Sequence, residues 1–359
     1  MFKFGLYLSK TFLITWLTTV FGFLVLIGLL DSLANGADIV ASGEGFQGTF
    51  RYMFLRAPVI FDRIFVFTLV VAILLVFVRL IRQHELVALL GFGISAPKQI
   101  LLLLPVVFGA SLVSITFIDV AMAPAVRSLQ DWGIGEYKIK NITSENPLWL
   151  EDGQNIVRAT ERISYTRLGD IQIFERGESG EVDSVLWAES ATFNNPNWTL
   201  DGVRILEVAG ADGEKRSAQN DPSPRIWETS QTPKTIARLA AEPRDISLSE
   251  MRNFMMRGNS GSKPRFAYSF WHAHRLTRPL AALILLLCCV PLMQRTGRED
   301  TGDKTLIVGI TMGFVFLIVD GAMATFATSG GIGVTTAITF PLALFALLGA
   351  FMLVRTESL

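Results

Sequence analysis

Six long apolar segments limit this chain to a small set of folds. They are residues 11–30, 58–78, 99–118, 279–293, 305–325 and 335–354. A helix needs about 20 mostly apolar residues to cross the roughly 30 Å hydrocarbon core of a bilayer. One such helix could lie buried in a large soluble core, but six in one chain favour a membrane protein. We therefore predict six transmembrane helices, although the fourth segment is short before Gln294.

The charged residues are concentrated between the third and fourth segments. Residues 124–265 contain 39 Lys, Arg, Asp and Glu residues, against 25 in the other 217 positions. Apolar and polar residues alternate there, with Gly, Asn, Asp and Pro between the runs, a pattern typical of short antiparallel strands. We predict an all-β domain, a sandwich or an open barrel, inserted between two membrane regions, residues 1–123 and 266–359.

Two local patterns within the inserted domain predict particular elements. The stretch NNPNW, from Asn194, has the turn residues of a hairpin. Further on, Ser247 and Glu250 have the three-residue spacing of a capping box, which predicts a helix that begins there. The domain contains no histidine and no arrangement of nucleophile, base and orienting group, so we expect no enzyme active site in it.

Basic residues predict the orientation of the spans. Lys and Arg are enriched in cytoplasmic loops. Before the first segment, between the second and third, between the fourth and fifth, and after the last, the chain has Lys3, Lys10, Arg79, Arg82, Lys98, Arg295, Arg298, Lys304 and Arg355. The loop after the first segment has two arginines but also three acidic residues. We expect both termini in the cytoplasm and the inserted domain on the opposite side of the membrane.

A charged connector separates the second and third segments. Residues 79–100 read RLIRQHELVALLGFGISAPKQI, which is too short and too charged to cross a bilayer. Leu86, Leu89 and Leu90 recur at helical spacing, and two glycines end the pattern. We predict a cytoplasmic helix over about residues 82–92.

Arg82 and Glu85 are expected on another face of this helix, three residues apart. A short helix fixed to two spans is suited to transmit a push from a partner that binds in the cytoplasm. A helix that rests on the lipid headgroups without a partner remains the alternative.

Ionisable residues lie near the predicted outer ends of the spans. They are Asp31, Arg56, Asp62, Arg63, Asp119, Arg275, Arg278 and Asp320. Charges in hydrocarbon are costly and usually face a bundle interior or a wet cavity, and the arginine fork suits bidentate contacts to phosphate. We expect the arginines to form a vestibule for a phosphorylated lipid, and Asp320 to face a cavity. Structural ion pairs and interfacial snorkelling are the alternative reading.

Motifs for catalysis and cofactor binding are missing from the sequence. No G-x-x-x-x-G-K-[ST] phosphate loop occurs, so any ATP must bind another chain. Neither HExxH nor CxxC is present, and His272 and His274 are two apart, which places them on different sides of a helix. Cys288 and Cys289 are adjacent within the fourth segment and are expected to fill apolar space. We expect no metal and no cofactor on this chain.

Several motifs resemble one family of membrane proteins. They are Arg82, Glu85, Leu86, Gly93 and Ser95 in the connector, RLTRPLAALIL from Arg275, GFVFLIVD from Gly313 and LWLEDGQNIVRA from Leu148. Together with the order of three spans, β domain and three spans, they resemble the LptF/LptG permeases, the transmembrane subunits of the lipopolysaccharide exporter of Gram-negative bacteria. The resemblance covers essentially the whole chain, and its details are nearer to LptG than to LptF.

The resemblance implies a fold, a set of partners and a mechanism. The inserted domain would be a periplasmic β-jellyroll, and the chain would work in the inner membrane with an LptF-like permease, an LptB-like ATPase dimer and an LptC-like bridge protein. The ATPase would carry the ATP and magnesium, so this chain would be a transporter subunit and not an enzyme. Glu85 would match the acidic residue of the coupling helix that enters the ATPase groove, accompanied by Arg82, Leu86 and Leu89.

One departure from the family concerns the lipid contact. Relatives commonly have lysines near the end of the first span that meet lipid A phosphates, whereas residues 29–40 read LLDSLANGADIV and contain no basic residue. We expect an arginine of the vestibule, Arg56, Arg63, Arg275 or Arg278, to substitute. This expectation comes from the topology and not from the family.

Other classes of protein remain open from the sequence. A permease of the lipoprotein-releasing type also pairs a periplasmic domain with a separate ATPase, but it has four spans. A membrane scaffold that transports nothing would bind no lipid and stimulate no ATPase. A proton-driven carrier using Asp31, Asp119 and Asp320 is a weaker alternative, because these acids lie at one level of the membrane and form no relay across it.

Overall fold

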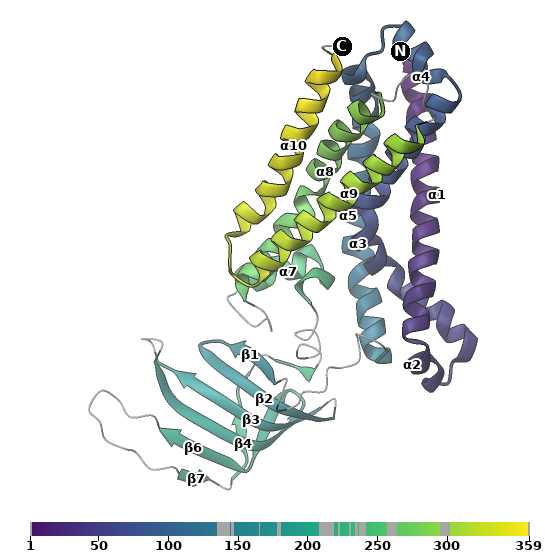
Figure 1. Ribbon diagram of the computed structural model, residues 1–359. Helices are drawn as coiled ribbons and strands as arrows, with labels where there is room; N and C mark the ends of the chain where they lie inside the picture. The colour runs from purple at the N-terminus through teal and green to yellow at the C-terminus, as the bar shows by residue number, and fades with distance from the viewer. Residues whose placement is uncertain are drawn as a thin grey trace. The chain divides into compact units, whose positions relative to one another are not determined.

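The computed structural model describes two compact units (Figure 1). The described residues are 2–134, 144, 147–164, 166–177, 181–207, 219–221, 223–229, 231–233, 236, 242–256, 264–294 and 302–357. Met1–Ala125 and Ser269–Leu359 form one unit, the helical unit, and Val126–Tyr268 form the other, the β unit. Arg295 and Arg298, which contributed to the predicted orientation, lie outside the described residues.

Six long helices contain the six predicted segments. They are α1 (Phe2–Ala34), α3 (Gly45–Arg82), α5 (Ala96–Trp132), α8 (Arg265–Gln294), α9 (Asp303–Thr328) and α10 (Val334–Glu357). Within the described part of the chain, these six are long and apolar enough to cross a membrane. The prediction of six candidate spans is therefore confirmed, and every helix extends beyond its apolar segment. A short helix, α2 (Gly36–Ala41), connects α1 and α3.

Helix α3 is the most buried of these helices. In its most apolar 18-residue stretch, 72% of the residues are buried, whereas in the corresponding stretches of α1 and α9 only 17% are buried. The ring of Phe67 lies 5.5 Å from that of Phe23 in α1 and 4.6 Å from that of Phe314 in α9, measured between centroids. A helix that is apolar on all sides lies either in a protein core or in lipid. Helix α3 is covered largely by the other helices of the chain, whereas α1 and α9 leave most of their apolar surface uncovered.

Glycines let α9 approach α3 closely. A Cβ atom added to Gly309 would lie 2.6 Å from a methyl group of Leu74, and one added to Gly313 would lie 3.1 Å from Val70. Helices in membranes gain much of their packing energy from such close approach of small residues. The positions of Gly309 and Gly313, one turn apart, therefore define the face of α9 that meets α3.

The β unit contains an antiparallel sheet. Its described strands are β1 (Leu148–Asp152), β2 (Asn155–Ser164), β3 (Arg167–Arg176), β4 (Val182–Asn194), β5 (Asn197–Asp201), β6 (Val203–Glu207), β7 (Gln219–Asp221) and β8 (Arg225–Trp227). They are ordered β1-β2-β3-β4-β5-β8, with β6 paired to β4 and β7 paired to β6. The predicted antiparallel β region in the middle of the chain is confirmed.

Strand β4 organises this sheet. It pairs along one edge with β3, and along the other edge with β5 and then β6. Asn194 and Asn197 face each other across the β4–β5 turn, which confirms the predicted hairpin. Between β5 and β6 the chain bends at Gly202, whose φ of +68° suits glycine, and an added Cβ atom would lie 2.8 Å from Glu189 of β4.

The core of the β unit forms around two tryptophans. Trp198 is 1% exposed, and its ring centroid lies 6.0 Å from that of Trp227. The indole N–H of Trp198 donates to the carbonyl of Gln231 at 2.7 Å, and that of Trp227 donates to Asp152 at 3.0 Å. Each buried indole therefore retains a hydrogen-bond acceptor, which large aromatic side chains need in a core.

The predicted capping box is present at the start of α7 (Leu248–Met256). The backbone N–H of Glu250 donates to the hydroxyl of Ser247 at 3.3 Å, and the backbone N–H of Ser247 donates to the Glu250 carboxylate at 3.2 Å. These reciprocal bonds satisfy two amides that a helix start leaves without partners. Glu250 also accepts a bond from Arg127, so that it links α7 to the end of α5.

Candidate functional site

A short helix connects α3 and α5 at the end of the helical unit that also holds both chain termini (Figure 1). This helix is α4 (Glu85–Gly91). Leu86 and Leu89 are buried, at 6% and 5% exposure, whereas Leu90, which the leucine spacing grouped with them, is 46% exposed. Val87 is also exposed. Helix α4 therefore anchors itself through two leucines and leaves part of its apolar surface uncovered.

The region predicted as one helix over residues 82–92 is two elements. Helix α3 ends at Arg82, and α4 begins only at Glu85. The chain turns at His84, which has a φ of +58°. Arg82 therefore belongs to α3 and does not share a helix with Glu85. Its guanidinium instead pairs with Asp303 of α9 at 2.7 Å, on an exposed surface.

Residues with a left-handed backbone conformation lie near both ends of α4. His84 precedes it, and Gly93, with a φ of +73°, follows shortly after it. Glycine adopts this conformation without steric cost, whereas a residue with a Cβ atom adopts it at a cost of about 1–2 kcal/mol. The Lys98 ammonium donates to the carbonyl of Gly93 at 2.8 Å, which holds the second turn. Helix α4 is therefore a rigid piece between two sharp turns.

The carboxylate of Glu85 is bonded by a tyrosine from the first helix. The hydroxyl of Tyr7 in α1 lies 3.2 Å from both carboxylate oxygens of Glu85. Among the described residues, no other hydrogen bond or ion pair reaches this carboxylate. Tyr7 was not predicted as part of this site, because a single tyrosine shortly before an apolar segment is ordinary in membrane helices.

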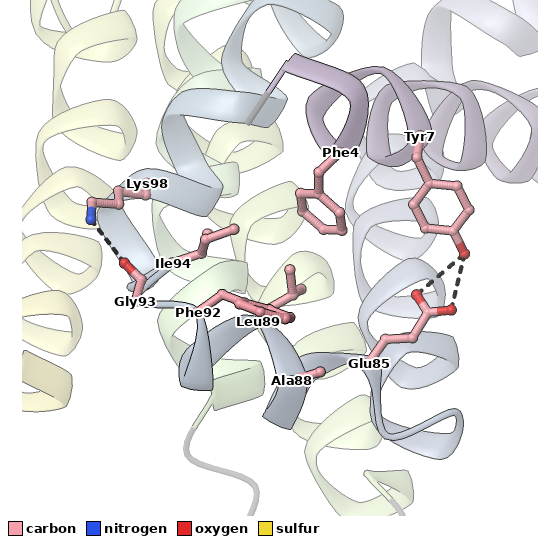
Figure 2. A pocket seen from close by; sticks show the side chains of 9 residues that line it. All are labelled: Phe4, Tyr7, Glu85, Ala88, Leu89, Phe92, Gly93, Ile94 and Lys98. Carbon is pink, nitrogen blue, oxygen red and sulfur yellow. Dashed lines mark hydrogen bonds between the residues drawn. The ribbon is translucent and has the colours of Figure 1, made fainter.

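Beside this contact lies a cavity of about 680 Å³. Figure 2 shows Phe4 on one side of it and Leu89 and Phe92 on the other, with the Tyr7–Glu85 contact at one end. Most of its wall is apolar. The cavity separates the start of α1 from most of α4, so the Tyr7 hydroxyl is the polar contact between these two helices in the described residues.

A second cluster surrounds Asp31 near the end of α1 that is remote from α4. Its carboxylate accepts from the Arg56 guanidinium at 2.7 Å and from the hydroxyl of Tyr52 at 3.1 Å. The side-chain amide of Asn35 donates to the Tyr52 hydroxyl at 3.1 Å. The sequence placed Asp31 and Arg56 at this level but gave no sign of Tyr52 or Asn35. The Arg56 side chain is only 5% exposed, so its charge is directed at Asp31 within this cluster and not at solvent.

Two arginines of α8 are also buried against acids. Arg278, with a side chain that is 4% exposed, donates to the carboxylate of Asp62 in α3, whose side chain is fully buried. Arg275, 2% exposed, lies 3.8 Å from the carboxylate of Asp119 in α5. These pairs join α8 to two other helices. Buried charges in such a bundle are expected to pair in this way.

Asp320 of α9 is paired with a histidine. The Nε2 atom of His274 in α8 lies 2.9 Å from a carboxylate oxygen of Asp320, and both side chains are mostly buried. The sequence analysis considered His274 only as a metal ligand. No group of three or more His, Cys, Asp or Glu side chains that could hold a metal ion occurs among the described residues.

Arg63 differs from the other arginines of the predicted vestibule. It is exposed on α3, next to the buried Asp62. Neither a hydrogen bond nor an ion pair joins it to any other residue in the described part of the chain. Of the four arginines, three thus have carboxylate partners within the helical unit, and Arg63 presents its charge outward.

Comparison with known proteins places the chain in a family. The sequence model described as "Lipopolysaccharide export system permease LptF/LptG" matches residues 6–355, nearly the entire chain. The chain belongs to the LptF/LptG family. The lipopolysaccharide export system permease protein LptG of Escherichia coli (strain K12) is 21% identical over 357 residues, which are 97% of each chain. The LptG protein of Haemophilus influenzae (strain ATCC 51907 / DSM 11121 / KW20 / Rd) is 21% identical over 221 residues, 60% of each.

Membership in the LptF/LptG family identifies the type of protein. LptF/LptG proteins are permeases of the lipopolysaccharide export system, so this chain is a transporter subunit and not an enzyme. Six apolar helices with an antiparallel β region between the third and fourth make it a multi-pass membrane protein. Neither the family match nor the structure tests the roles assigned to Glu85 or to the arginines, which therefore remain predictions.

Proposed function

We propose that this chain is the transmembrane subunit of an ABC-type exporter in the inner membrane. It extracts lipopolysaccharide from the outer leaflet and passes it to a periplasmic bridge. An LptF-like permease pairs with it, an LptB-like ATPase dimer supplies the energy, and an LptC-like protein joins the bridge. The observation that carries this proposal is the family match over residues 6–355.

The coupling step is assigned to α4. This helix is short, lies between two long helices, and exposes Val87 and Leu90. The Glu85 carboxylate at its first turn is available to a basic groove on the ATPase. Since the sequence contains no phosphate-binding loop of its own, the force must arrive through such a contact. In this proposal α4 and both termini lie in the cytoplasm, and the β unit lies in the periplasm.

The β unit is assigned to the bridge. Its antiparallel sheet ends at β1 on one side, and we propose that the sheet is jellyroll-like and continues into the LptC-like protein. The apolar core around Trp198 would then lie next to the path of the acyl chains.

The lipid-contacting residues are proposed in two groups. Arg63, which is exposed, binds a phosphate of the lipid A portion. The paired residues Asp31, Arg56, Arg275, Arg278 and Asp320 hold the helices that form the wall. Because the three arginines among them already face carboxylates, they contribute little net attraction for an anionic lipid.

The coupling assignment is tested by charge reversal. In proteoliposomes containing both permeases and the ATPase, Glu85→Lys should abolish lipopolysaccharide extraction and reduce copurification of the ATPase. Glu44→Lys is the matched control, because Glu44 is a partly exposed acid, 34% exposed, whose partner Arg51 is 48% exposed. Normal extraction and normal assembly with Glu85→Lys would refute the assignment.

The lipid assignment is tested by crosslinking. A photoreactive amino acid at Arg63 should capture lipopolysaccharide in the active complex. The same group at Ile307 serves as the control, because Ile307 is exposed near the start of α9, where Asp303 pairs with Arg82 at the end of α3. If Arg63 captures no more lipid than Ile307 in a complex that hydrolyses ATP, the lipid assignment is wrong.

Two alternative functions predict different observations. A lipoprotein-releasing permease would need four spans, and the six candidate spans of this chain weigh against it. A scaffold without transport activity would leave the ATPase rate of an LptB-like protein unchanged when the chain is added.

A further inference from the structure

The Glu85 carboxylate is held from outside its own helix. Glu85 stands at the first position of α4, where the preceding residue, His84, provides no side-chain cap. A glutamate in this place ordinarily has several rotamers in water. Here the Tyr7 hydroxyl lies 3.2 Å from each carboxylate oxygen, which selects one of them (Figure 2).

Two turns separate α4 from the long helices on either side of it. His84 has a φ of +58° and Gly93 a φ of +73°. One side of α4 is anchored by the buried side chains of Leu86 and Leu89. The other side faces the cavity of about 680 Å³ between it and the start of α1. On that side the Tyr7–Glu85 hydrogen bond is the polar contact that holds α4 among the described residues.

We propose that Tyr7 is a positioning residue, which fixes the direction of the Glu85 carboxylate and ties α4 to α1. This inference rests on the proposed coupling role of Glu85. Tyr7 itself meets no lipid and no nucleotide in this account. It orients the acid for the ATPase and transmits the displacement of α4 to the first helix, so that movement of α4 changes the position of α1.

The first test measures the motion of α4 and does not depend on transport. A nitroxide spin label is attached at Val87, an exposed position of α4, in the full complex. Tyr7→Phe keeps the ring and removes the hydroxyl, and it should make the label more mobile. Thr18→Val is the control, because among the described residues the Thr18 hydroxyl bonds only the carbonyl of Ile14, in its own helix. An unchanged spectrum with Tyr7→Phe would overturn the proposal.

The second test measures lipopolysaccharide extracted per ATP hydrolysed. Tyr7→Phe should lower this ratio about three- to tenfold, less than the full effect of a buried bond to a charged group because Tyr7 is partly exposed. Copurification of the ATPase should be unchanged. Glu85→Asp keeps the charge but shortens the side chain by one methylene, which moves the carboxylate away from the Tyr7 hydroxyl. It should therefore lower the ratio as Tyr7→Phe does, and it tests the same contact if Tyr7→Phe folds poorly.

Combining the two variants separates positioning from a structural role. If Tyr7 acts through Glu85, adding Tyr7→Phe to Glu85→Asp lowers the ratio no further. A multiplicative loss in the double variant would overturn the proposal. Normal coupling in Tyr7→Phe beside a defect in Glu85→Asp would also overturn it, leaving the coupling role of Glu85 intact. Normal coupling in both would refute that role and the inference together.

Discussion

The buried pair of Asp62 and Arg278 gives the sharpest stability prediction. Asp62 has a fully buried side chain, and that of Arg278 is 4% exposed. Among the described residues, Arg278 bonds only this carboxylate, and its Nη1 atom is buried without a hydrogen-bond partner. Asp62→Asn therefore leaves a buried guanidinium with no compensating charge. We expect the free energy of unfolding to fall by about 3–5 kcal/mol, the usual cost of breaking a buried pair from one side.

Removing both charges should be much less harmful. Asp62→Leu combined with Arg278→Met removes both charges of this pair, and such apolar replacements are often neutral or stabilising. We expect the double variant to lose less than about 1.5 kcal/mol. The control is Glu44→Gln, which breaks an exposed pair with Arg51 and should cost less than about 0.5 kcal/mol.

The assay is unfolding of the purified chain in mixed micelles, followed by tryptophan fluorescence as the denaturing detergent is increased. The order of stability should be wild type, then Glu44→Gln, then the double variant, with Asp62→Asn clearly last. The reasoning would be refuted if Asp62→Asn cost less than about 1 kcal/mol, or if the double variant were as unstable as the single one.

Three further variants test other contacts. Gly309→Val should push α9 away from α3, because even one added carbon would lie 2.6 Å from Leu74. In the same detergent titration we expect the free energy of unfolding to fall by about 1–3 kcal/mol, and an unchanged value would contradict the close packing of the two helices. Ser247→Ala removes the cap of α7 and should lower the free energy of unfolding by about 1 kcal/mol, measured by thermal unfolding of the full chain. Ser247→Asp, which can also cap a helix, should retain most of that stability. Asp303→Asn breaks an exposed contact to Arg82, so its unfolding midpoint should match that of wild type.

The sequence was sufficient for the main elements of the fold. Five of the six apolar segments have about the length that a spanning helix needs, the fourth being shorter, and the alternation in the middle region favours strands. The hairpin at Asn194 and the capping box at Ser247 were predicted because their signals are local. Pairings between more distant residues, such as β4 with β6 and β5 with β8, have no local signal and were not predicted.

The candidate site was predicted only in outline. The sequence predicted charged residues near the ends of the spans but not which of them pair, because a carboxylate and a guanidinium 216 positions apart show no periodicity that joins them. The break between Arg82 and Glu85 was missed for a different reason. It depends on His84 adopting a left-handed conformation, which side chains with a Cβ atom take up only when the surrounding chain requires it.

Helix α9 meets its neighbours through unlike contacts along its length. Near one end Asp303 forms a water-exposed pair, toward the other Asp320 forms a mostly buried pair, and between them Gly309 and Gly313 present a smooth surface. Salt weakens the exposed pair far more than the buried one. A rise in ionic strength should therefore weaken the Arg82–Asp303 contact while leaving the Asp320 contact and the close packing at Gly309 and Gly313 in place.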